Sequence, residues 1–197
     1  MNEKLTGGEI PLEGIAHDKI FSHMENLRGD DCNYRDGKTF SMVYHLGGRH
    51  EELMKTVVSS YLEENYLNPM AFQSIRKMEQ ELVTIVSDML HGDSQIVGAA
   101  TSGGTESILL ACKTYRDRWN KKSFFGRPEM ILAESAHVAF EKAAHYFGIK
   151  IKRLPLDNGY KADLTKLEKM INRKTCMVVL SAPQYPHGRI DPIVNAA

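Results

Sequence analysis

The sequence has 197 residues, of which 42% are hydrophobic and 25% are charged, a balance typical of globular proteins. Lysine plus arginine equals aspartate plus glutamate, at 25 each, so the zero net charge favours neither a nucleic acid nor a membrane surface as partner. No stretch approaches the ~20 apolar residues that cross a bilayer, and the polar N-terminus lacks the apolar centre of a signal peptide. We therefore expect no membrane segment in this chain, and one large domain or two small ones.

Three cysteines, Cys32, Cys112 and Cys176, are widely spaced and form no CxxC pair. An odd number at such spacing is typical of reduced thiols, and it favours neither a disulfide framework nor a zinc site. The sequence therefore predicts a cytoplasmic protein that holds no metal.

Residues 1–47 form the first of three predicted segments, followed by 48–94 and 95–197. The first segment is rich in polar and turn residues and has no sustained periodicity, as in "LRGDDCNYRDGKTFS". We expect a loop-rich arm, and such arms often pack on a partner subunit.

The second segment is predicted to be helical. From Arg49 to Tyr66 apolar pairs recur every four residues, which indicates a helix. The next helix carries an apolar face that ends at Met89, with Gly92 as its stop. This helix starts either at an N-cap formed by Asn68 before Pro69 or nearer Ser74, and the sequence leaves both starts open.

From residue 95 the pattern changes to short apolar runs that alternate with helices. Strands are expected at 95–100, 130–133, 149–154 and 176–182, and helices at 105–120, 138–147 and 164–172. Strands separated by helices indicate βαβ units. The predicted fold class is α/β, with a mostly parallel sheet flanked by helices and preceded by a helical N-terminal segment.

A glycine turn joins the first of these predicted strands to an amphipathic helix in "TSGGTES". Glycine is a poor helix former, so Gly103 and Gly104 mark a turn. A strand, a glycine turn and a helix start in this order present free backbone N–H groups to an anion. The backbone of Gly103, Gly104 and Thr105, with a hydroxyl from Thr105 or Ser102, is therefore a candidate phosphate cradle. The alternative is a tight connection without a ligand.

A histidine lies at the start of another predicted helix, in "ESAHVAFEKAAHYFG". If Ser135 caps this helix, His137 falls in its first turn, where the helix dipole favours the neutral imidazole. A flat neutral ring suits stacking on an aromatic ligand, although a lone histidine is often only structural. His145 lies eight residues on, a spacing that makes no usual metal site.

An irregular loop with two prolines and Gly188 follows the last predicted strand, in "LSAPQYPHGRIDP". Open α/β sheets bind ligands at the carboxyl ends of their strands, so this loop is a second candidate part of a site. Asp191 is also expected to cap the next helix, with Pro192 at its first position.

Together these stretches resemble pyridoxal-5'-phosphate (PLP) enzymes of fold type I, in the group II decarboxylase-like branch and most closely the sphingosine-1-phosphate lyases. The matching segments are "SMVYHLG", "IRKMEQELVTIVSDMLHG", "TSGGTESILLACKTYRDRW", "SAHVAFEKAAHYFGIKIKRLPLD" and "SAPQYPHGRIDPI". The resemblance implies that PLP is the cofactor and that Gly104 and Thr105, beside Gly103, hold its phosphate. It also implies that His137 stacks on the pyridine ring as a catalytic residue, and that Tyr44 and Asn68 approach the substrate.

The activity that the resemblance implies is retro-aldol cleavage of a phosphorylated long-chain amino alcohol by a homodimer. The segment "LNPMAFQSIRKME" lacks a histidine that the lyases carry there, so an L-amino-acid decarboxylase is the alternative. The family's cofactor-bonding lysine lies beyond the "GRID" motif, but the last lysine here is Lys174. We therefore expect an N-terminal fragment, inactive by itself. A structural or interaction fragment is the alternative of another class.

Overall fold

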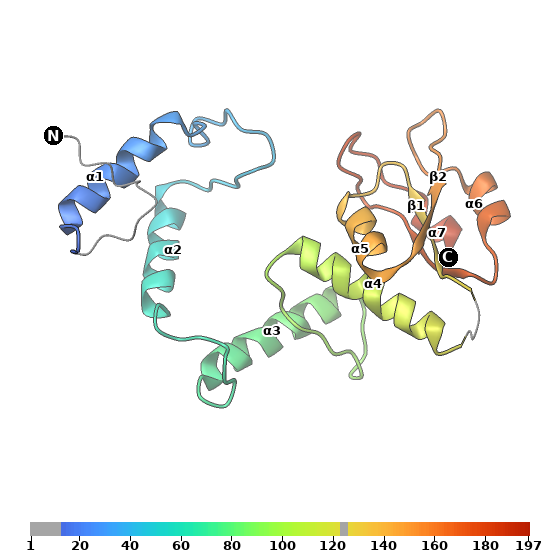
Figure 1. Cartoon of the computed structure of the whole chain (residues 1–197), viewed down its shortest axis with the longest axis horizontal. Coiled ribbons are helices and arrows are strands. Elements are labelled where there is room, and N and C mark those ends of the chain that lie inside the picture. Colours follow the sequence, from blue (N-terminus) through green and yellow to red (C-terminus); the bar gives the residue numbers. More distant parts are fainter. Residues whose placement is uncertain (1–12, 123–125) are drawn as a thin grey trace. The chain divides into compact units, whose positions relative to one another are not determined.

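The computed structural model describes residues 13–122 and 126–197. The chain separates into two compact units, Met1–Ile75 and Arg76–Ala197 (Figure 1). The boundary between the units falls inside helix α3 (Gln73–Met89). The functional division at residues 47 and 94 stays a prediction.

The first unit contains helix α1 (His17–Leu27), a 3-10 turn (Arg28–Asp30) and helix α2 (Gly48–Ser60). Helix α1 lies in the segment that we expected to be loop-rich, and the sequence analysis missed it. Its apolar residues recur at helical spacing over only three turns, a weak pattern. Helix α2 was predicted, but it ends six residues earlier than the expected end at Tyr66.

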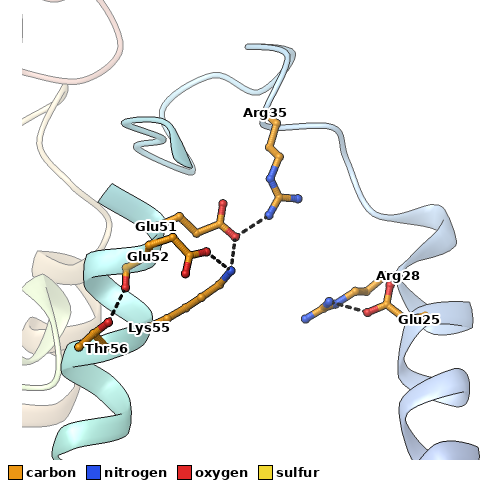
Figure 2. A network of polar contacts seen from close by, with 7 residues as sticks. All are labelled: Glu25, Arg28, Arg35, Glu51, Glu52, Lys55 and Thr56. Carbon is orange, nitrogen blue, oxygen red and sulfur yellow. Dashed lines mark hydrogen bonds and ion pairs between the residues drawn. The ribbon is translucent and has the colours of Figure 1, made fainter. Parts of the chain in front are cut away.

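Ion pairs tie the loop after α1 to helix α2. Figure 2 shows Arg35 Nη2 donating to Glu51 Oε1 at 3.1 Å, while Lys55 Nζ lies 3.4 Å from the same oxygen. The positive charge of Arg35, followed by that of Lys55, lowers the pKa of Glu51 below its ordinary value. These side chains are half exposed, so the contacts order the loop more than they stabilise the unit.

Helix α3 begins at Gln73, so the predicted start nearer Ser74 is correct and the start at Asn68 is wrong. Asn68 Oδ1 accepts the N–H of Met70 at 3.0 Å, and this local turn competes with helix formation at Pro69. None of the residues of α3 is buried.

The predicted strand at 95–100 does not form. No described strand lies beside this segment to complete a ladder, so its backbone groups find other partners. The N–H of Ala100 donates to Glu79 Oε1 at 2.8 Å, and a Cβ placed on Gly98 would lie 3.1 Å from Val83. The segment therefore packs on α3.

Three parallel strands form the sheet of the second unit, in the order β2-β1-β3. They are β1 (Glu129–Ala133), β2 (Lys150–Leu154) and β3 (Thr175–Val179). In the register, Glu129 lies opposite both Lys150 and Thr175. The three strands and the parallel sheet were predicted, with bounds that differ by one to three residues.

Helices cover both faces of this sheet (Figure 1). Helices α4 (Gly104–Asn120) and α5 (Ala139–Phe147) contribute to a core with Met130 and Leu132. Helix α6 (Leu164–Met170) packs on the other face with Ile131 and Ala133. A short helix α7 (Ile193–Ala196) ends the chain. Successive side chains of β1 point to opposite faces, and both faces are covered, so the whole strand is buried.

Two cysteines lie in the core between α4 and the sheet. Burial, with a smaller contribution from Cys176, raises the pKa of the Cys112 thiol to about 11. A thiol with such a pKa stays protonated and unreactive, as expected for a reduced structural cysteine.

The direction of α4 brings its N-terminus to the carboxyl edge of the sheet. Near its C-terminus, Trp119 Nε1 donates to the carbonyl oxygen of Arg173 at 3.1 Å, just before β3 begins. The helix has 17 residues and rises about 25 Å, which is longer than a five-residue strand. Gly104 therefore lies at the edge where β1 and β3 end.

Candidate functional site

The N-terminus of α4 has open backbone donors. Gly103 is its N-cap residue, and no side chain caps the helix. The amides of the first turn, including those of Gly104 and Thr105, have no acceptor within the helix. A Cβ placed on either glycine would meet no atom within 4 Å, so a ligand can approach the backbone closely. Residues 103–105, predicted as the phosphate cradle, thus have the donors that an anion needs.

The hydroxyl groups around this turn divide into engaged and open ones. Thr101 Oγ1 donates to the carbonyl oxygen of Gly103 at 3.0 Å and lies 2.7 Å from Ser107 Oγ. Ser102 donates both its N–H and its hydroxyl to Glu106 Oε2, each at 2.7 Å. The Thr105 hydroxyl makes no hydrogen bond to any described residue. Of the two alternatives left by the sequence, Thr105 is therefore the hydroxyl open to a ligand.

Glu106 is a residue of the site that the sequence analysis missed. Hydrogen bonds from the Ser102 hydroxyl and then from its backbone N–H lower the pKa of this carboxyl. A carboxylate in the first turn of a helix is a recognisable pattern, but it does not reveal which group the side chain contacts. Only the folded chain brings this carboxylate to Ser102.

His137 lies between β1 and α5, at the same carboxyl edge as Gly104. Its Nδ1 accepts the backbone N–H of Ala139 at 3.1 Å, a contact that fixes the orientation of the ring. The ring is exposed and open to a ligand. Helices α4 and α5 also pack on the same face of the sheet.

The predicted cap at Ser135 is wrong. Helix α5 begins at Ala139 with Val138 as its N-cap residue, which places His137 before the first turn. The imidazole of His137 accepts the N–H of Ala139, the first residue of the helix. The Ser135 hydroxyl is buried and has no hydrogen-bond partner among the described residues.

The predicted capping role of Asp191 is also wrong. The residue is only 1% exposed, and its two carboxylate oxygens accept the N–H groups of Ala162 and Ser181 at 2.9 and 2.8 Å. Neither oxygen bonds an N–H of helix α7, which has Pro192 as its N-cap residue and no side-chain cap. Asp191 instead ties the loop after β3 to the segment that precedes α6.

A second buried side chain shapes the same loop. Gln184 is 1% exposed and donates from Nε2 to the carbonyl oxygen of Tyr160 at 2.9 Å. The rings of Tyr160 and His187 stack with their centres 4.6 Å apart. Gly188 has a φ of 62°, a left-handed conformation that glycine adopts without strain. The loop at the carboxyl edge is therefore well defined.

The predicted substrate residues lie in the first unit. Tyr44 is 85% exposed, and the Asn68 side chain closes the turn before α3. The cradle and His137 lie in the second unit. The roles of Tyr44 and Asn68 stay predictions.

Among the described residues, no group of three or more metal-ligating side chains is close enough to hold an ion. No described helix is both long and apolar enough to cross a membrane. An apolar groove of about 380 Å³ runs between α3 and the segment before the cradle, lined among others by Leu82, Val86 and Val97.

Residues 54–197 match the aminotransferase class-V family. The chain belongs to this family. Its fold is that of the large domain of fold type I enzymes, and its homologues are enzymes that depend on PLP. The predicted family, fold and cofactor are thus confirmed.

The similar proteins include several lyases. The chain is 38% identical over 188 residues to sphingosine-1-phosphate lyase 1 of Rattus norvegicus, a match that covers 95% of this chain and 33% of the relative. It is 40% identical over 190 residues to the lyase of Dictyostelium discoideum, covering 95% and 36%. A solved sphingosine-1-phosphate lyase of Burkholderia pseudomallei matches with a TM-score of 0.87 and 30% identity, covering 97% and 46%. The chain spans about a third of the length of these curated relatives.

Proposed function

We propose that this chain carries the cofactor-phosphate site of a PLP-dependent carbon–carbon lyase that cleaves a phosphorylated long-chain amino alcohol. The observation that carries the proposal is the open N-terminus of α4 at the same sheet edge as His137. This helix end has backbone amides without acceptors and a free Thr105 hydroxyl. No side chain at Gly103 or Gly104 blocks the approach of a ligand to the backbone.

The chemistry of these groups fits the cofactor. A phosphate ester has only acceptor oxygens, and it binds well where backbone N–H groups, a hydroxyl and the positive end of a helix dipole converge. An aromatic cofactor ring stacks on the flat face of another aromatic ring. The imidazole of His137 offers such a face, and the bond from the N–H of Ala139 to its Nδ1 holds the ring in place.

The bound cofactor supplies an electron sink for the bond that breaks beside a substrate amine. The residues of this chain bind and orient: 103–105 hold the phosphate, and His137 holds the ring plane. In the substrate, the C2–C3 bond breaks and its electron pair stays with C2, which takes up a proton. The C3 hydroxyl loses its proton and becomes an aldehyde, so the products are a long-chain aldehyde and an aminoethyl phosphate.

The similarity to lyases supports this bond cleavage over decarboxylation, since the relatives at 38% and 40% identity are sphingosine-1-phosphate lyases. An L-amino-acid decarboxylase would use the same phosphate cradle but would release carbon dioxide. The histidine missing from "LNPMAFQSIRKME" is the residue pattern that favours this alternative.

We extend the proposal to two residues of the first unit and to the assembly. Tyr44 and Asn68 contact the substrate, and the enzyme works as a homodimer in the cytoplasm. The match of "SMVYHLG" to the family supports a role for Tyr44, and three unpaired cysteines support a reducing compartment. The test of Tyr44 is its replacement with phenylalanine in the full gene product. Unchanged turnover and unchanged substrate affinity in this variant would contradict the proposed role.

The sharpest test of the cofactor site is Gly104→Ala in the full gene product. The substitution should stabilise α4 by about 0.5 kcal/mol, because alanine is the better helix former and the new methyl meets no atom. It should nevertheless weaken binding of PLP at least about tenfold, because the methyl occupies the approach path of the phosphate. Absorbance titration with the cofactor measures the affinity, and urea unfolding measures the stability. Unchanged affinity would contradict the site.

The reaction is tested with the wild-type gene product loaded with cofactor. It should release a long-chain aldehyde from a phosphorylated long-chain amino alcohol and no carbon dioxide from L-amino acids. Release of carbon dioxide without aldehyde would contradict the lyase reaction and support decarboxylation. The proposed cofactor site would remain valid in that case.

A further inference from the structure

The glycine turn before α4 is held by a carboxylate from the same helix. Glu106 lies in the first turn of α4, where the helix dipole favours a negative charge. A carboxylate at this position also repels any anion bound at the helix N-terminus. The residue therefore either supports phosphate binding through the turn or opposes it through its charge.

The hydrogen bonds indicate support. A single oxygen, Glu106 Oε2, accepts both the N–H and the hydroxyl of Ser102 at 2.7 Å. Hydrogen bonds to a charged acceptor are shorter and stronger than those between neutral groups. They also offset part of the negative charge that an incoming anion meets.

The other side of the turn is held independently. The hydroxyls of Thr101 and Ser107 lie 2.7 Å apart, and Thr101 bonds the carbonyl oxygen of Gly103. The turn is thus anchored at Ser102 by Glu106 and at Gly103 by this hydroxyl pair. Both anchors use side chains and leave the amides of residues 104 and 105 open.

Such anchoring matters because two adjacent glycines are conformationally free. A flexible turn would lose conformational entropy when a ligand orders it. A turn that is already held in place presents its N–H donors without that entropic cost. Donors hold an anion well only when their supporting residues lock them in place.

We propose that Glu106 is a positioning residue of the phosphate site, which fixes the amides of Gly104 and Thr105 by holding Ser102. This inference rests on the proposed cofactor site and adds a residue that acts on it through Ser102. It predicts that a negative charge close to the phosphate strengthens phosphate binding.

The test compares Glu106→Gln with wild type in the full gene product, with PLP and with pyridoxal, which lacks the phosphate, as probes. Glutamine has nearly the same shape but no charge, so its bonds to Ser102 are weaker. Affinity for PLP should fall about tenfold, while affinity for pyridoxal stays within about twofold. A general loss of structure would weaken both probes, and a merely repulsive Glu106 would make PLP bind more tightly in the variant.

Three further variants complete the test. Ser102→Ala keeps the backbone bond to Glu106 and loses the hydroxyl bond, so its loss of affinity for PLP should be smaller, about threefold. The double variant should lose less than the product of the two single losses, because both substitutions weaken the same contact between residues 102 and 106. Asp117→Asn removes a charge of the same sign near the far end of α4, where Asp117 pairs with Lys113, and should leave PLP binding unchanged.

The outcomes separate the two proposals. If wild type fails to bind PLP, the cofactor site and the role of Glu106 both fall. If wild type binds and Glu106→Gln binds PLP equally well or better, only the role of Glu106 falls. Circular dichroism shows whether Glu106→Gln is folded. If Glu106→Gln is not folded, Ser102→Ala decides the question: an unchanged affinity of that variant for PLP would overturn the role of Glu106.

Discussion

Strand β1 is a short apolar run and helix α3 carries an apolar face, yet only the strand is buried. All five residues of β1 are buried, whereas none of the residues of α3 is. The strand has a neighbour on each side and helices on both faces. An apolar pattern therefore predicts that an element forms, but its burial depends on which partners lie against it.

The strongest test of this contrast replaces the same residue type in both elements. Leu132 of β1 is 1% exposed, so Leu132→Ala should lower the free energy of unfolding by about 3 kcal/mol. Leu82 of α3 is 57% exposed, so Leu82→Ala should cost less than about 1 kcal/mol. Urea denaturation of both variants measures the difference.

Equal losses for the two leucine variants would break the comparison. They would indicate that the apolar face of α3 is as well covered in solution as β1. A loss below about 1 kcal/mol at Leu132 would instead contradict the packing of the sheet.

A second prediction extends the contrast to polar groups. Asp191→Ala leaves the buried N–H of Ala162 and the partly buried N–H of Ser181 without acceptors. The expected loss is about 3 kcal/mol, since each buried donor left unpaired costs about 1–3 kcal/mol. Urea denaturation again measures it. The matched control is Asp93→Ala, whose carboxylate accepts the exposed N–H of Gln95, a donor that water can satisfy after the change. Equal losses for the two variants would contradict the burial argument.

The smallest expected effect concerns pH and the cap of α6. The Asp163 side chain accepts the N–H groups of Thr165 and Lys166, and the Thr165 hydroxyl is the main cause that lowers the pKa of this carboxyl below 3.8. Because the folded-state pKa is the lower one, the cap stabilises the protein above pH 3.8 and the contribution is lost as pH falls through the folded value. Asp163→Ala should lower Tm by about 3 °C at pH 7 and less at about pH 2.5.

Thermal unfolding at the two pH values checks this prediction. Thr165→Val serves as the control, because it removes the hydroxyl that donates to Asp163 and leaves the backbone bonds in place. Its effect on Tm should have the same sign and be smaller. A drop of Tm for Asp163→Ala that is the same at both pH values would contradict an ionised cap.

Much of the second unit could be predicted from local patterns. The runs "MILA" and "CMVVLSA" lie between helices and became β1 and β3, because an apolar run flanked by turn residues has few other solutions. Gly148 ends α5 with a φ of 65°, as a glycine after a helical run should. The glycine turn before α4 was likewise predicted at its observed place.

The errors arose where a residue had several possible partners. Ser135 and Asp191 were both expected to cap the helices that follow them, and each has another environment in the structure. The segment 95–100 reads as a strand, but no described strand pairs with it. Local sequence gives the capacity of such residues for hydrogen bonding, and distant residues decide how it is used.

The sequence by itself determined the order of helices and strands from α4 onward, the glycine turn and the family, because these depend on short-range periodicity and on motifs within a few residues. Tertiary structure alone decided that α4 points its N-terminus to the edge where His137 lies, and that Ser102 is bound to Glu106 while Thr105 stays open. The physical reason is that a hydrogen bond needs its two atoms within about 3 Å and aligned, a condition that spacing along the chain does not specify.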